Sequence, residues 1–136
     1  MDFPMSDSLM AYEIEDYEFK VLCDNVLSRI PAKYVEEFPC FSIYEGYSKW
    51  GAHVIDDSAT FNVGMLKKVA MGDNQVLIGI IAHEFAHVFL GHADGEDERT
   101  GLEKEREADQ LARHWGFVEE IEEFRRRLQP SEDGQG

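Results

Sequence analysis

Two histidines four residues apart are the clearest chemical feature of the sequence. His83, Glu84 and His87 form an H-E-x-x-H pattern. On a helix, residues i and i+4 lie on one face, so both imidazoles can reach the same metal ion. Zinc accepts neutral imidazole nitrogens and keeps a position for water, whose proton a neighbouring carboxylate can take. The pattern therefore predicts Zn²⁺ as the cofactor and Glu84 as the catalytic carboxylate.

The segment around this motif is apolar on every side of the predicted helix. Between Val76 and Leu90 the only ionisable residues are His83, Glu84 and His87. A helix that is apolar all round is buried, and buried charged groups are costly unless they are paired or bound to a metal. The alternative explanation, two hydrogen-bonded core histidines beside a buried ion pair, requires unrelated coincidences on a helix with no other polar group.

A zinc site of this kind requires a third protein ligand. In one known pattern, H-E-x-x-H-x-x-G-x-x-H, a glycine and a histidine follow the second motif histidine by three and six residues. Here Gly91 and His92 follow His87 by four and five residues, so both are misplaced. His92 is better explained as a helix-terminal residue, where a partly positive imidazole suits the helix dipole.

The acidic segment 103–109 offers a better third ligand, because it lies on a predicted helix with an apolar stripe. Projection at 3.6 residues per turn places Glu105 at the edge of the stripe and Asp109 one turn further along the same side. Glu103 points to the opposite face, and Glu107 lies well off the stripe. Glu105 is therefore the predicted ligand, and Asp109 can accept a hydrogen bond from a ligand histidine. The stripe consists of Ala108, Leu111, Ala112 and Trp115.

The two segments together resemble a known metallopeptidase family. His-Glu-Phe-Ala-His followed by Glu-Arg-Glu-Ala-Asp is similar to the gluzincin pattern, H-E-x-x-H with a downstream E-x-x-x-D. The resemblance covers residues 59–116 and is greatest to the small soluble minigluzincins and to the soluble cores of CAAX-processing membrane peptidases. The second motif is also similar to that of ImmA-like peptidases, which usually carry Asn where this chain has Asp109.

The resemblance implies a role for each motif residue. His83, His87 and Glu105 would be the zinc ligands, Glu84 the general base, and Asp109 the support of a ligand histidine. The implied activity is that of a zinc-dependent endopeptidase acting on a peptide or protein substrate.

The family also implies a substrate-binding edge strand just upstream of the metal helix. Residues 59–64 match that place, and Ala59, Thr60, Phe61, Asn62 and Val63 would pair with the backbone of an extended substrate. The resemblance offers no residue that stabilises the oxyanion, because His114 projects away from Glu105 on its helix.

The secondary structure expected from the sequence is that of a small zincin-like α+β domain with about four helices and a three-stranded sheet. Turn residues Asp56-Asp57-Ser58 separate two apolar runs and predict a hairpin. Gly72-Asp73-Asn74 breaks the chain and supplies an N-cap for the helix that carries His83 and His87, and Gly91 closes that helix. Thr100 with Glu103 forms a capping box. Helices are expected at 8–30, from the break at 72–74 to residue 90, at 100–115 and at 117–128, strands at 40–44, 52–55 and 59–63, and a loop at 94–99.

The length, composition and net charge of the chain limit the classes of protein to which it can belong. A chain of 136 residues with 43% hydrophobic residues fits one domain, with flexible ends at 1–6 and 130–136. The net charge of −15 disfavours nucleic acid and anionic membranes as partners. The first residues do not resemble a secretory signal, so a cytoplasmic location is expected. Cys23 and Cys40 have no metal-binding spacing and are expected to be reduced core thiols.

Two alternatives to the peptidase stay open at this point. The chain could bind zinc and a protein partner, such as a repressor, with little or no general proteolysis. It could also hold a purely structural zinc ion, although such a site has no use for the buried carboxylate of Glu84.

Overall fold

The computed structural model describes residues 9–37, 41–49, 51–55, 57–91 and 101–128. These residues form an α+β fold, as predicted, with six helices and four strands rather than about four and three. In chain order the elements are β1 (Leu9–Glu13), α1 (Tyr17–Arg29), α2 (Ala32–Glu37), β2 (Phe41–Glu45), β3 (Ala52–Ile55), β4 (Ser58–Phe61), α3 (Val63–Ala70), α4 (Asn74–Leu90), α5 (Gly101–His114) and α6 (Val118–Arg127).

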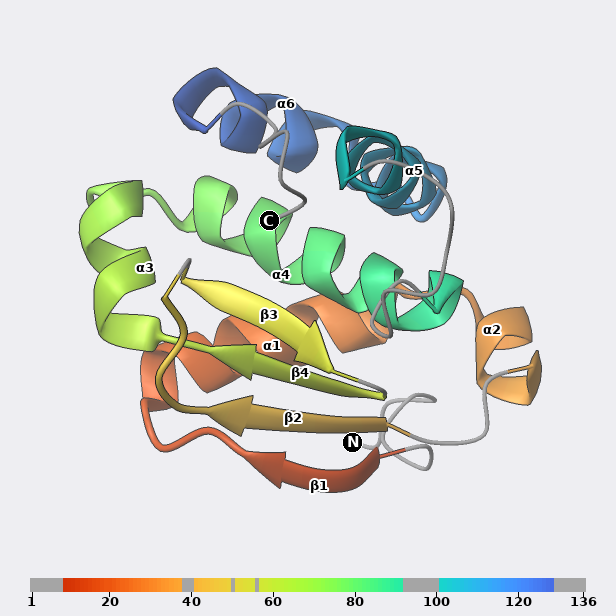
Figure 1. Ribbon diagram of the computed structural model, residues 1–136, viewed down its shortest axis with the longest axis horizontal. Helices are drawn as coiled ribbons and strands as arrows, with labels where there is room; N and C mark the ends of the chain where they lie inside the picture. The colour runs from red at the N-terminus through yellow and green to blue at the C-terminus, as the bar shows by residue number, and fades with distance from the viewer. Residues whose placement is uncertain (1–8, 38–40, 50, 56, 92–100, 129–136) are drawn as a thin grey trace.

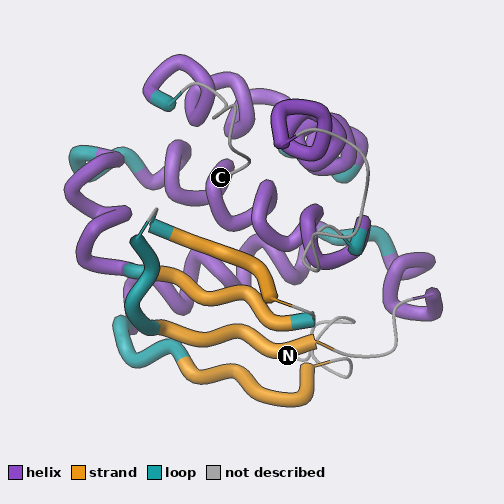
Figure 2. Tube along the Cα trace, viewed as in Figure 1, coloured by secondary structure: helices purple, strands orange, loops and turns teal. Residues whose placement is uncertain are grey.

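The four strands form one mixed sheet in the order β1-β2-β4-β3 (Figures 1 and 2). β1, β2 and β4 are parallel, and β3 runs antiparallel to β4. The predicted hairpin is confirmed as β3 and β4, and the predicted strand 40–44 corresponds to β2. Among the described strands, β1 and β3 are the edges, and β4 has a neighbour on both sides.

Helix α4 lies between the sheet and the last two helices (Figure 1). On its sheet side, Phe85 packs against Phe41 of β2 and Phe61 of β4, with ring centroids 5.6 Å and 6.1 Å apart. Phe19 of α1 packs against Phe61 at 5.3 Å. On the other side, α5 and α6 both contact α4. All residues from Gly79 to Val88 are consequently buried, which explains why this helix is apolar all round.

Local signals set both ends of α4, as predicted. At the start, the Asp73 side chain accepts a hydrogen bond from the N–H of Gln75. At the end, Gly91 has a left-handed φ of 69°, and its N–H donates to the carbonyls of His87 and Val88. Glycine adopts this conformation without the steric penalty of a side chain.

The prediction of one long helix over residues 8–30 is wrong. Residues 9–13 form strand β1, and α1 begins only after its N-cap residue, Asp16. The Glu45 carboxylate of β2 accepts hydrogen bonds from the backbone N–H groups of Glu15 and Asp16. These contacts come from a strand far along the chain, so the helical spacing of apolar residues could not indicate them.

The two short helices α2 and α3 are absent from the sequence prediction. Helix α3 replaces the end of the predicted strand 59–63, because β4 stops at Phe61 and Val63 is already helical. The Asn62 side chain accepts a hydrogen bond from the N–H of Met65. Asparagine is a favoured N-cap residue, and this cap overrides the alternating pattern that suggested a longer strand.

The last two helices lie within one residue of their predicted ends. Gly116 separates them with a φ of 106°. Cys23 is a buried free thiol, as expected. None of the described helices combines the length and apolar character needed to cross a membrane. Other predictions fall outside the described residues: the chain ends 1–6 and 130–136, Cys40, the loop 94–99 and the capping residue Thr100.

One glycine sets how closely α6 approaches α4. A Cβ atom on Gly79 would lie 2.4 Å from the backbone oxygen of Glu120 and 3.1 Å from the Cβ atom of Phe124. Interiors are close-packed, and a heavy atom cannot occupy a position so near to a rigid backbone group. The missing side chain therefore lets α6 lie directly against α4.

Gly79→Ala is expected to destabilise the protein by about 1–3 kcal/mol, the usual effect of overpacking, although alanine is the better helix former by about 1 kcal/mol. Gly64→Ala in α3 is the matched control, because a Cβ atom there meets nothing within 4 Å. It should leave stability unchanged or raise it slightly. Urea unfolding compares the two variants, and equal stabilities would show that α6 does not need the close approach at Gly79.

Candidate metal centre

Four polar side chains from two helices meet where α4 faces α5. His83 and His87 come from α4, with ring centroids 4.5 Å apart and planes at 86° to each other. Glu105 and Asp109 come from α5. All four are buried, and His87 is the most exposed at 7%. Buried polar atoms need partners, and here these side chains provide them for one another.

Three of these side chains converge on one point, and they are the three predicted ligands. The Oε2 atom of Glu105 lies 2.6 Å from Nε2 of His83 and 2.8 Å from Nε2 of His87. The two Nε2 atoms are 3.1 Å apart. Within the part of the chain that the structure describes, this is the one group of His, Cys, Asp and Glu side chains whose ligand atoms cluster closely enough to hold a metal ion.

Asp109 determines which nitrogen of His83 carries a proton. Its Oδ1 atom lies 2.8 Å from Nδ1 of His83. Arg125 of α6 also donates to Asp109, from Nε to Oδ2 at 2.7 Å and from Nη2 to Oδ1 at 3.0 Å. A carboxylate held by a guanidinium stays ionised, so Nδ1 of His83 donates to it. In the neutral imidazole the lone pair is then on Nε2, which faces Glu105.

This arrangement fits a zinc ion. A lone pair on Nε2 of His83 facing a carboxylate oxygen at 2.6 Å is repulsive unless a proton or a metal cation lies between them. The other oxygen of Glu105, Oε1, is buried without a hydrogen-bond partner. In a tetrahedral site with ligand distances of about 2.0–2.1 Å, neighbouring ligand atoms are about 3.3 Å apart. Small side-chain movements would therefore admit the ion.

In the absence of a metal, the same contacts shift the pKa values of the cluster. Burial lowers the pKa of His83, but hydrogen bonds with Asp109 and Glu105 outweigh it and raise the pKa to about 9. Burial opposes the ionisation of Glu105 and Asp109, but their hydrogen bonds, first of all with His83, hold the pKa of both carboxyl groups below the usual range. A metal ion bound by this group would therefore compete with a proton for Nε2 of His83.

Glu84 lies beside the cluster without belonging to it. Its Oε2 atom is 3.9 Å from Nε2 of His83, and this oxygen is buried without a hydrogen-bond partner. Burial raises the pKa of Glu84 to about 8, and the charge of His83 opposes the shift only in part. A carboxyl group with an unused oxygen next to three converging ligand atoms is well placed to exchange a proton with water.

The competing residues of the sequence analysis lie outside the cluster. Glu103 is exposed and Glu107 is half-buried, and neither belongs to the ligand group. His114 is exposed at the end of α5, as expected from its helix face. His92 falls in the part of the chain that is not described.

The prediction that residues 59–63 form an edge strand for substrate is wrong. Strand β4 pairs with β2 on one side and with β3 on the other, so its backbone groups are already used. Asn62 and Val63 are the cap and the first residue of α3. The sequence predicts the hairpin but not the order of strands, which depends on β2 pairing with β4 rather than with β3.

Arg125 is the site residue that the sequence analysis missed. It follows Ile121 by four residues and so lies beside the apolar stripe of α6, which was the available signal. Its side chain is 12% exposed, whereas that of Arg126 is 68% exposed. Three consecutive arginines do not by themselves indicate which of them faces the interior.

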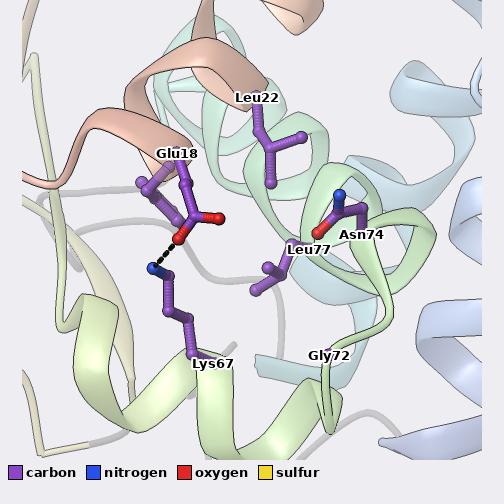
Figure 3. A pocket seen from close by; sticks show the side chains of 7 residues that line it. Glu18, Leu22, Lys67, Gly72, Asn74 and Leu77 are labelled. Carbon is purple, nitrogen blue, oxygen red and sulfur yellow. Dashed lines mark hydrogen bonds and ion pairs between the residues drawn. The ribbon is translucent and has the colours of Figure 1, made fainter.

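A separate cavity of about 310 Å³ lies near the start of α4 (Figure 3). Lys67 and Glu18 form an ion pair at 3.2 Å within its lining. Leu77 in its wall precedes His83 by six residues, which is about 9 Å along a helix. The cavity therefore shares no residue with the candidate metal centre. Its lining consists of Glu18, Phe19, Leu22, Lys67, Gly72, Asn74 and Leu77.

Comparisons with models of protein families, with curated proteins and with solved structures found no match for this chain. Its function is therefore inferred from the motif and from the geometry of the candidate metal centre.

Glu105→Ala removes one of the three converging ligands and is expected to abolish most zinc retention in the purified protein. The zinc-dependent part of its thermal stability should disappear as well. Glu107→Ala, two residues away on the same helix, is the control and should keep the zinc content of the wild type. Elemental analysis of the purified proteins makes the comparison. Full zinc occupancy in Glu105→Ala would contradict the assignment.

Proposed function

We propose that this protein is a zinc-dependent endopeptidase acting on a peptide or protein substrate. The observation that carries the proposal is the convergence of His83, His87 and Glu105 on one buried point, with Glu84 beside it. Three protein ligands leave one tetrahedral position for water or substrate, which is typical of catalytic zinc sites. The similarity of the two motifs to the gluzincin pattern supports the same reaction.

In this mechanism the chain's own residues move and hold protons. A zinc ion would supply Lewis-acid chemistry, polarising the peptide carbonyl and lowering the pKa of water. Glu84 takes the proton of the attacking water through its unused buried oxygen. It returns a proton to the amine nitrogen as the C–N bond breaks. His83 keeps its Nδ1 proton throughout, because Asp109 accepts a hydrogen bond from that nitrogen.

A purely structural zinc site is the competing explanation, and Glu84 argues against it. Structural sites fill all four positions with protein ligands, whereas the described residues offer three. A buried carboxyl oxygen without a hydrogen-bond partner is destabilising, and a closed structural site has no use for it. In a peptidase, water and substrate would occupy the place next to this oxygen.

The direction of the backbone groups supports the edge strand β3 as the place where a substrate strand would bind. The N–H of Gly46 donates to the carbonyl of Phe61, so the backbone groups of Phe61 in β4 point toward β2. The direction of the backbone N–H and C=O groups alternates from one residue to the next along a strand. The backbone groups of Thr60 therefore point toward β3, where Thr60 lies opposite His53. By the same alternation, the N–H and C=O groups of Val54 point away from β4.

The outer side of β3 is the place where we expect a substrate strand to pair. Among the described strands, none pairs with β3 on that side. β3 also contacts α4, the helix that carries His83, Glu84 and His87 (Figure 1). An extended peptide paired with this edge would therefore lie beside the metal helix, with affinity from backbone hydrogen bonds.

Glu84→Gln is expected to keep zinc and the fold but to lose roughly two to four orders of magnitude in kcat, the range for a general base. Glu122→Gln on the exposed side of α6 is the control. Cleavage of an unfolded protein by the zinc-loaded enzymes, followed by mass spectrometry, measures the difference. Loss of zinc in Glu84→Gln would make Glu84 a ligand instead. A wild type that binds zinc but cleaves no unfolded protein would favour the regulatory alternative.

Val54→Pro removes one outward N–H group from β3 and should weaken peptide binding with little effect on zinc affinity. Proline is tolerated on an edge strand where the N–H points away from the sheet, so the fold should persist. Val54→Thr keeps the N–H group and is the control. The measurement is KM for a peptide substrate together with zinc affinity. An unchanged KM in Val54→Pro would remove β3 from substrate binding.

A further inference from the structure

A row of buried contacts connects the metal centre to α6. Nδ1 of His83 donates to Asp109, and Asp109 in turn accepts two hydrogen bonds from Arg125. The exposed fractions of the three side chains are 0%, 6% and 12%. Arg125 is not a member of the ligand group, so any effect of it on a bound metal must pass through Asp109 and His83.

The guanidinium group of Arg125 holds both oxygens of Asp109. Two N–H groups in a rigid fork fix the plane of the carboxylate as well as its position. The same Oδ1 atom accepts from Nη2 of Arg125 and from Nδ1 of His83. An Asp109 carboxylate that cannot rotate keeps the His83 ring in one tautomer and directs its Nε2 atom toward Glu105.

Further contacts on α6 hold Arg125 in this orientation. Its guanidinium carbon lies 4.2 Å from the centroid of the Phe124 ring, and Nη1 donates to the carbonyl of Leu128 at 3.2 Å. Phe124 packs edge-on against the His83 ring, with centroids 5.3 Å apart. The close approach of α6 to α4 at Gly79 brings the Phe124 ring to His83. Helix α6 therefore constrains His83 directly, through a ring contact, and indirectly, through Asp109.

We propose that Arg125 is a positioning residue of the metal centre, setting zinc affinity through Asp109 without touching the metal. The inference rests on the proposed zinc site but not on peptidase activity. Without Arg125, the Asp109 carboxylate would lose two of its three hydrogen bonds described here and could rotate away from His83. A buried carboxylate that loses its cationic partner is also strongly destabilised.

A double-mutant cycle on zinc affinity tests whether Arg125 acts through Asp109. Chelator competition gives the zinc Kd of the wild type, Arg125→Gln, Asp109→Ala and the double variant. We expect Arg125→Gln to weaken zinc binding roughly tenfold, the lower end of the range for outer partners of metal ligands. It should have no further effect in the Asp109→Ala background. Arg126→Gln, which alters the exposed neighbour, should match the wild type. Additive effects, or an unchanged Kd in Arg125→Gln, would overturn the proposal.

A spectroscopic measurement separates positioning from a general loss of stability. In the protein loaded with Co²⁺, the Nδ1 proton of His83 should give a paramagnetically shifted, exchangeable NMR signal. We expect this proton to exchange with solvent faster in Arg125→Gln than in the wild type or in Arg126→Gln. Equal exchange rates would contradict the proposal even if zinc affinity fell.

Arg125→Lys keeps the positive charge but loses the two parallel N–H donors of the guanidinium group. This variant also serves as the test if Arg125→Gln does not fold. Lysine should recover only part of the affinity, because one ammonium group does not match both carboxylate oxygens. Full recovery would show that charge alone matters, against the proposal. A wild type that binds no zinc would reject both the zinc site and this inference. Zinc binding without proteolysis would reject only the peptidase, and the cycle would still decide the role of Arg125.

Discussion

The burial of charged groups around His83 is the constraint on which the rest of the structure depends. Helix α4 is enclosed by the sheet on one side and by α5 and α6 on the other, so the side chains of His83, Glu84 and His87 have almost no contact with water. Each buried charge needs an opposite charge, a hydrogen bond or a metal ion. Glu105 and Asp109 provide such partners from α5, and Arg125 provides one from α6. The apolar packing of these helices and their polar contacts must therefore form together.

The balance of charges also explains why α5 and α6 both contribute charged side chains to this site. Glu84, Glu105 and Asp109 carry three negative charges when ionised, and Arg125 supplies one positive charge. A zinc dication would supply the remaining two, so that the group with neutral imidazoles would carry no net charge. Without the ion, protons take its place, in agreement with the raised pKa values of His83 and Glu84.

The strand order determines which strand edge lies beside the helix that carries this buried site. Strand β4 is interior to the sheet, and the Asn62 cap turns the chain out of the sheet into α3 directly after it. The edge beside α4 therefore belongs to β3, whose backbone at Val54 faces outward. The candidate metal centre and this edge of the described sheet therefore lie beside the same helix, which is the arrangement that the proposed backbone recognition of an extended peptide requires.

The sequence by itself determined helix α4, because its signals are local: the break at residues 72–74, the cap at Gly91 and the histidine spacing act within one helix. The same holds for the choice of Glu105, since the periodicity of a single helix selects its buried side. Only the tertiary structure decided that residues 9–13 form a strand, that β3 rather than β4 is an edge, and that one particular arginine of α6 reaches Asp109. Each of these depends on contacts between segments far apart in the chain, where pairing and close approach outweigh local preference.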